Sequence, residues 1–157
     1  MDKSVIAQTL ADEIRAANEC MTAAMNNLAG PYGKAYGRCV SDLYYSCYHL
    51  ASALLASKGI SVGSHEAAQK LLALHYVKPA ALPRDTTAKL NDLMDKRHVA
   101  DYRPYIFIGS QDIAVFRPWI ADFVRRVLKL LGKSAPAADA GALLRAVADF
   151  EKIRLEA

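Results

Sequence analysis

The residues best suited to chemistry are polar side chains on two separate predicted helices. One set repeats along a single side of its helix, at i, i+4, i+7 and i+11: Arg38, Asp42, Tyr45 and His49. The other set ends its helix with two pairs that each share a face: Arg97 with Asp101, and His98 with Tyr102. Arginine offers a fixed fork of donors to a phosphate, and histidine titrates near neutral pH. If the two helices pack together, both sets border one groove with a phosphate clamp and a general base, the groups that metal-free RNA cleavage needs.

Each role in such a groove has its own candidates. The candidate catalytic residues are Arg97, His98 and His49. The candidate ligand-binding residues are Arg97, Asp101, Tyr102, Tyr45, His49 and Asp42. A structural interpretation explains the same spacing by an Arg97–Asp101 helix pair and a hydrogen-bonded core histidine. Spacing alone leaves both interpretations open.

Metal and cofactor motifs do not match this sequence. The four histidines include no pair at ligand spacing, and neither Glu-x-x-His nor His-Glu-x-x-His occurs. A GxxxxGK[ST] phosphate loop is also missing. We therefore expect no metal site and no cofactor.

The composition predicts an all-α fold that positions these residues. Alanine and leucine are abundant, whereas the 157 residues include only 8 glycines and 6 prolines. Apolar spacing of three and four predicts five helices, at 3–29, 34–58, 64–77, 86–102 and 111–131. Ser64 and Ser110 are expected to cap two of them. Pro118 is expected to kink or restart the last of the five, and 103–109 to be extended or irregular.

These elements predict an antiparallel bundle of four to five helices over residues 1–132. Residues 133–138 are predicted to form a linker before an additional helix over 139–157, either docked on the bundle or bound to a partner. Its apolar side is predicted to combine five residues: Leu143, Leu144, Val147, Phe150 and Ile153.

Charge and cysteine usage suggest where the protein works. The net charge is +4, and the positive excess falls in the C-terminal half, where it could face nucleic acid, an acidic protein or only solvent. The three cysteines are an odd number without CxxC spacing, which favours a reducing compartment. Neither a signal peptide nor an apolar run of membrane-spanning length is apparent. We expect a soluble, cytoplasmic protein with no membrane contact.

Two segments of this sequence resemble one known family. The first is LYYSCYHLASALL at 43–55, followed by Gly59 and by Ser64-His65 at a helix start; the second is LMDKRHVADY at 93–102. Both are similar to the signature stretches of small prokaryotic HEPN-domain proteins, in the same order. The resemblance spans roughly residues 8–131.

The resemblance implies an all-α bundle that forms a homodimer and serves in toxin–antitoxin, defence or stress systems. Many members are metal-independent ribonucleases, often encoded beside a minimal nucleotidyltransferase that acts as the antitoxin. Their nuclease motif is an arginine followed, after four to six residues, by a histidine. This chain departs from it, because the only histidine after Arg97 is the adjacent His98.

Three functional hypotheses follow. The first is a dimeric module that binds RNA, a nucleotide or a protein partner through Arg97. The second is an active metal-independent ribonuclease toxin with a rearranged site, in which His98 or His49 is the base. The third is a dimerising adaptor in which the same residues only support the fold.

Overall fold

The computed structural model describes residues 1–155, and within them it contains six α-helices and no strand. The helices are α1 (Lys3–Asn26), α2 (Tyr36–Ser57), α3 (His65–Leu72), α4 (Thr86–Tyr102), α5 (Ser110–Leu131) and α6 (Ala137–Lys152). A π-helical turn, Ala73–Val77, extends α3, and a 3-10 turn, Gly132–Ser134, follows α5. The all-α prediction is confirmed.

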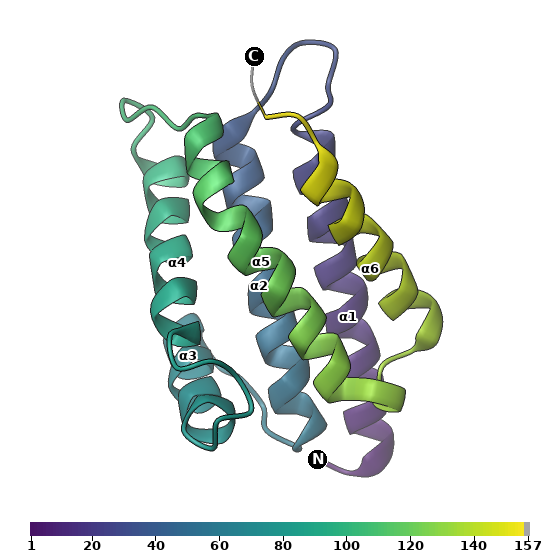
Figure 1. Ribbon diagram of the computed structural model, residues 1–157. Coiled ribbons are helices and arrows are strands. Elements are labelled where there is room, and N and C mark those ends of the chain that lie inside the picture. The colour runs from purple at the N-terminus through teal and green to yellow at the C-terminus, as the bar shows by residue number, and fades with distance from the viewer. Residues whose placement is uncertain (156–157) are drawn as a thin grey trace.

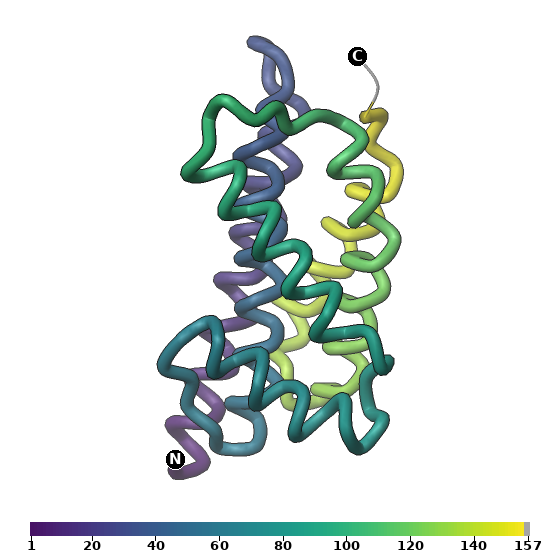
Figure 2. Tube along the Cα trace, turned by 90° about the vertical axis from the view of Figure 1, so that its left-hand side faces the viewer, coloured from purple at the N-terminus to yellow at the C-terminus, as the bar shows by residue number. Residues whose placement is uncertain are grey.

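The long helices form an antiparallel bundle in which successive helices reverse direction (Figure 1). The α1–α2 hairpin lies on one side, and α5 and α6 lie on the other. Seen from the side, α4 crosses obliquely in front of both pairs (Figure 2). This crossing places the C-terminal half of α4, which carries Arg97, over α2.

Local signals explain where α1 and α3 begin and where α2 ends. The Asp2 side chain accepts from Val5 N at 2.9 Å, and the Ser64 hydroxyl accepts from Ala67 N at 3.0 Å, so the predicted cap at Ser64 is confirmed. Gly59 follows α2 with a φ of +76°, a conformation in which a side chain would be strained.

The expected cap of α5 is wrong: Ser110 is already its first helical residue, and the N-cap is Gly109, whose N–H donates to the Asp112 carboxylate at 2.9 Å. At Pro118 we expected a kink or a restart, and the restart is not found, because α5 is one helix from Ser110 to Leu131 with the proline inside it. Its apolar side is buried before and after the proline, at Ile113, Phe116 and Ile120.

The core is built around α2, whose predicted apolar stripe is buried throughout. Seven stripe residues are at most 1% exposed: Val40, Leu43, Tyr44, Cys47, Ala51, Leu54 and Leu55. Behind them, the Ser46 hydroxyl donates to the Ala17 carbonyl of α1 at 2.8 Å. The buried, central position of α2 makes it a rigid base for the polar side chains on its remaining side.

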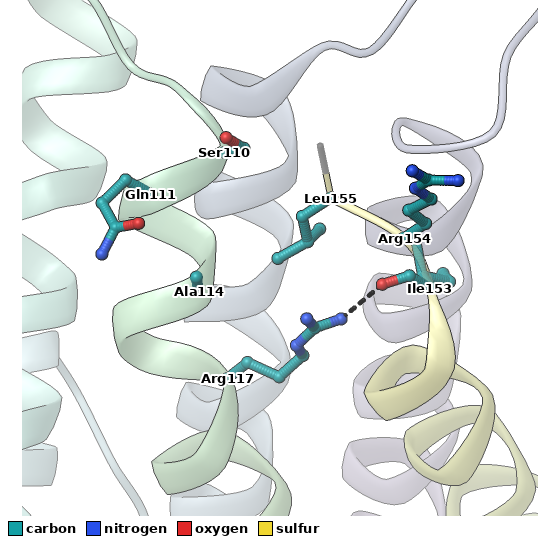
Figure 3. A pocket seen from close by; sticks show the side chains of 7 residues that line it. All are labelled: Ser110, Gln111, Ala114, Arg117, Ile153, Arg154 and Leu155. Atoms are coloured by element: carbon teal, nitrogen blue, oxygen red, sulfur yellow. Dashed lines mark hydrogen bonds between the residues drawn. The ribbon is translucent and has the colours of Figure 1, made fainter. Parts of the chain in front are cut away.

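Helix α6 packs against α1 and α5. Its residues Leu143, Val147 and Phe150 are buried, whereas Leu144, which we predicted on the same side, is 41% exposed. Arg117 of α5 donates to the carbonyl of Phe150 at 3.0 Å and to that of Ile153 at 2.7 Å, and Figure 3 shows the second of these bonds. The guanidinium thereby supplies donors to carbonyls at the C-terminal end of α6.

Candidate functional site

The two polar sets predicted from spacing meet where α4 crosses α2. Arg97 Nη1 donates to the Tyr45 hydroxyl at 2.7 Å, which joins the two helices directly. Asp101 lies on the same side of α4, and its carboxylate accepts from the Ser41 hydroxyl of α2 at 3.3 Å. Arg97 therefore lies at the contact between the two helices, held by a residue from each of the two predicted polar sets.

Arg97 is a buried cation with incomplete compensation. Its residue is 6% exposed, and its Cζ lies 5.3 Å from the ring centroids of both Tyr44 and Tyr45. The Asp101 carboxylate is 3.6 Å from Nη1, which is an ion-pair contact too long for a hydrogen bond. The buried Nε has no hydrogen-bond partner. Burial of a charge without full pairing is costly in free energy.

His98 and Tyr102 continue the site toward solvent. Arg97 Nη2 is 3.2 Å from His98 Nε2. The His98 ring lies 5.9 Å, centroid to centroid, from the ring of Tyr102, which is 70% exposed. Further along the chain, in the segment between α4 and α5, Tyr105 and Phe107 are 80% and 85% exposed. Exposed aromatic rings next to a cationic site are the usual platform for unpaired nucleobases.

Arg97 and the side chains around it, Tyr44, Tyr45, His98 and Asp101, form what we call the Arg97 cluster. His65 also belongs to it, although helical spacing did not predict this. Its Nδ1 forms a hydrogen bond of 2.7 Å with the Tyr44 hydroxyl, and its ring lies 4.1 Å from the Tyr48 ring. Burial lowers the pKa of His65 below 6.5, and the positive charge of Arg97 lowers it further. The imidazole is therefore neutral at pH 7. The Ser64-His65 helix start was visible in the sequence, but its packing against α2 was not.

The other predicted site residues lie toward α1 instead of Arg97. His49 Nδ1 is 2.7 Å from the Glu13 carboxylate, and the Asn27 amide donates to Asp42 at 2.8 Å. Burial raises the pKa of Asp42, although Arg38 and Asn27 counteract this effect. The structure thus groups Arg97, Tyr45 and Asp101 closely and leaves His49 and Asp42 as neighbours of a different helix.

Metal ligation finds no support in residues 1–155, where no group of three or more His, Cys, Asp or Glu side chains could hold a metal ion. Within the same residues, no helix is long and apolar enough to cross a membrane.

The two segments with a family resemblance, 43–55 and 93–102, lie on α2 and α4 of this helical bundle. The bundle and these two helices define the class to which the chain belongs. The HEPN domain family model matches residues 11–133, and the protein is a member of that family. It is also similar to the "Putative toxin MJ0142" of Methanocaldococcus jannaschii, with 30% identity over 77 residues. That match covers 49% of this chain and 52% of the relative, so it spans about half of each protein.

Proposed function

We propose that the protein is the RNA-directed component of a toxin–antitoxin system and that it binds single-stranded RNA by a phosphate at Arg97. The observation that carries the proposal is the buried guanidinium, which lies against two tyrosine rings with a carboxylate only at 3.6 Å and an unpartnered Nε. A phosphate oxygen would supply the missing acceptor and the missing charge.

The surroundings of Arg97 support RNA over a free anion. Three exposed aromatic residues follow Arg97 within ten positions of the sequence, and unpaired bases can stack on their rings: Tyr102, Tyr105 and Phe107. Membership of the HEPN domain family and a relative named as a toxin support the toxin–antitoxin setting. From the family resemblance we also propose a cytoplasmic homodimer whose antitoxin is a nucleotidyltransferase or another protein.

Metal-independent cleavage of RNA is a second candidate function. The observation that favours it is His65, whose neutral imidazole shares Tyr44 with Arg97 and could accept the proton of a 2′-hydroxyl. Attack of that oxygen on the adjacent phosphorus would form a cyclic phosphate and break the bond to the 5′ oxygen, which would leave with the proton that the imidazole had accepted, returned directly or through solvent. His98 lies beside the guanidinium as the other candidate base.

A single experiment distinguishes these functions. Purified protein is mixed with labelled single-stranded RNA in EDTA, and both binding and cleavage are measured for the wild type, Arg97→Met, His98→Ala and His65→Ala. Arg126→Gln is the control, since that arginine is paired with Asp122 on α5 at 2.6 Å, outside the contacts of the Arg97 cluster.

The binding function predicts RNA affinity that falls at least tenfold in Arg97→Met and is unchanged in Arg126→Gln. Cleavage that continues in EDTA and fails in both Arg97→Met and His65→Ala would establish the ribonuclease instead. If the wild type neither binds nor cleaves RNA, both functions are wrong, and the adaptor hypothesis takes their place.

A further inference from the structure

A cavity of about 370 Å³ lies between α1, the second half of α2 and the loop that follows α2. Its walls combine apolar side chains and one aromatic residue with several polar groups. The lining includes Val5, Ile60, Val62, Tyr48, Glu13 and Ser52. Cavities of this size and mixed lining are typical of small-molecule sites.

Ser52 shows that the lining of this cavity is not satisfied by the protein itself. The residue is 6% exposed, and its hydroxyl has no hydrogen-bond partner. Within residues 1–155, the buried side-chain atoms without a partner are Ser52 Oγ and Arg97 Nε. Unsatisfied buried polar groups are rare because each costs free energy, so the Ser52 hydroxyl in the wall of a cavity is a candidate for contact with a ligand.

Glu13 determines which chemical groups the cavity accepts. One of its oxygens, Oε2, is 2.7 Å from His49 Nδ1, which fixes the carboxylate in place, and the side chain remains 27% exposed. A carboxylate repels phosphate and accepts hydrogen bonds from N–H groups. The cavity is therefore suited to the base of a nucleotide and not to its phosphate.

Tyr48 connects the cavity to Arg97. Its ring lines the cavity and lies 4.1 Å from the His65 ring, while His65 bonds to Tyr44, whose ring faces Arg97. A continuous row of aromatic side chains thus runs from the guanidinium to the cavity wall. A base in the cavity can stack on Tyr48 while a phosphate of the same strand is bound at Arg97.

We propose that this cavity binds an unpaired guanine of the RNA and that Glu13 is the residue that selects it. Guanine presents two adjacent donors, N1–H and the N2 amino group, which match the two oxygens of a carboxylate. Adenine and cytosine place a ring-nitrogen acceptor beside their amino group, and uracil flanks its one N–H with two carbonyls, so each would face Glu13 with at least one repulsive contact. Ser52 lines the same cavity, and a rotation of its side chain would bring the buried hydroxyl to the guanine O6 as a donor.

This inference rests on the proposed RNA-binding function, and its test separates the two. Affinities of a labelled oligouridine and of the same strand with one central guanosine are measured by fluorescence anisotropy. The wild type should prefer the guanosine strand about tenfold or more, since a well-placed pair of base contacts has that effect. Glu13→Gln should reduce the preference to within about twofold, and Ser52→Ala should reduce it in part. Glu19→Gln, an exposed change on the same helix, should leave it intact.

Equal affinities for the two strands, together with Arg97-dependent binding, would overturn the guanine assignment and leave RNA binding in place. A strand with a central adenosine that binds as well as the guanosine strand would overturn it too. Free guanosine provides the complementary measurement by NMR titration: saturable shifts at Tyr48 that vanish in Glu13→Gln, without any RNA binding, would keep the guanine cavity and overturn the proposed function. If neither RNA nor guanosine binds, both the proposed RNA-binding function and the guanine assignment are wrong.

Discussion

Replacement of Arg97 by methionine tests whether this buried cation serves function or stability. If Arg97 only supports the fold, its removal should lower the free energy of unfolding. If it serves to bind an anion, its removal should change that free energy little, because the burial of the charge is itself unfavourable. Methionine has a similar length and fits the same apolar space without a charge, so Arg97→Met isolates the charge and its hydrogen bonds.

The expected magnitude follows from the contacts of Arg97. The variant loses a charged hydrogen bond to Tyr45, which contributes about 1.5–3 kcal/mol, two ring contacts of about 0.5–1 kcal/mol each, and the ion-pair contact with Asp101, which contributes about 0–1 kcal/mol. It also removes the desolvation cost of the buried guanidinium with its orphaned Nε, which is about 3–5 kcal/mol. The free energy of unfolding of Arg97→Met should therefore lie within about 2 kcal/mol of the wild-type value.

Urea denaturation at pH 7.5, followed by far-ultraviolet circular dichroism, measures this difference. The companion variant is Tyr45→Phe, which should destabilise the wild type by about 1–3 kcal/mol, because it leaves a buried guanidinium donor without its acceptor. In the Arg97→Met background the same change should cost less than about 0.5 kcal/mol. A loss of more than 3 kcal/mol in Arg97→Met, or an equal cost of Tyr45→Phe in both backgrounds, would refute the reasoning.

Three further predictions concern the scaffold and its response to pH. Pro118→Ala should raise the free energy of unfolding by about 1–3 kcal/mol, and with it the urea midpoint, because alanine restores a helical N–H inside α5. An unchanged midpoint would show that the helix is already adapted to the proline. The pKa of His65 is lower in the folded state than in the unfolded chain, so below about pH 6.5 the unfolded chain binds more protons than the folded protein does. The contribution of His65 to stability is therefore present above that pH and is lost as the pH falls below it. Unfolding at pH 7.5 and 5.0 should accordingly show a smaller difference in His65→Gln than in the wild type. Phe150→Ala should cost about 3–5 kcal/mol if α6 is part of the cooperative fold, whereas Leu144→Ala, at an exposed position, should cost less than about 0.5 kcal/mol in the same denaturation assay.

The helices could be predicted from the sequence because each depends on a pattern within itself. The apolar stripe of α2 and the cap at Ser64 are local signals, and both are found in the structure. The Tyr45–Arg97 contact could also be anticipated, since each residue lies on the polar side of a helix whose other side is apolar. The prediction for Leu144 is wrong because neighbouring apolar residues on a helix do not all contact the core. Leu143 faces the core, whereas Leu144 lies at the edge of the apolar side and remains 41% exposed.

Side-chain partnerships between distant segments could not be predicted in the same way. His65 reaches Tyr44 only because the loop after α2 returns α3 to its side, and His49 finds Glu13 because α1 flanks α2 there. Helical spacing placed His49 on the same stripe as Tyr45, yet the two face different neighbours, because the stripe is wide enough to lie against α1 at one edge and α4 at the other. Which edge a residue faces depends on the packing of the bundle and not on its own helix.

The proposed binding of RNA at Arg97 leads to a last prediction, which concerns Asp101. The nuclease motif that the family resemblance implies has four to six residues between its arginine and its histidine, and this chain lacks that histidine; one turn after Arg97 it has instead a carboxylate 3.6 Å from Nη1. A phosphate bound at Arg97 would compete with that carboxylate and be repelled by it, so Asp101 should lower the affinity for RNA. Asp101→Asn keeps the shape and the acceptor for Ser41 but removes the charge, and it should strengthen RNA binding about three- to tenfold by anisotropy at 0.1 M salt. Weaker binding in Asp101→Asn would instead make Asp101 a positioning residue for Arg97, and competition with phosphate would no longer account for the incomplete pairing of that arginine.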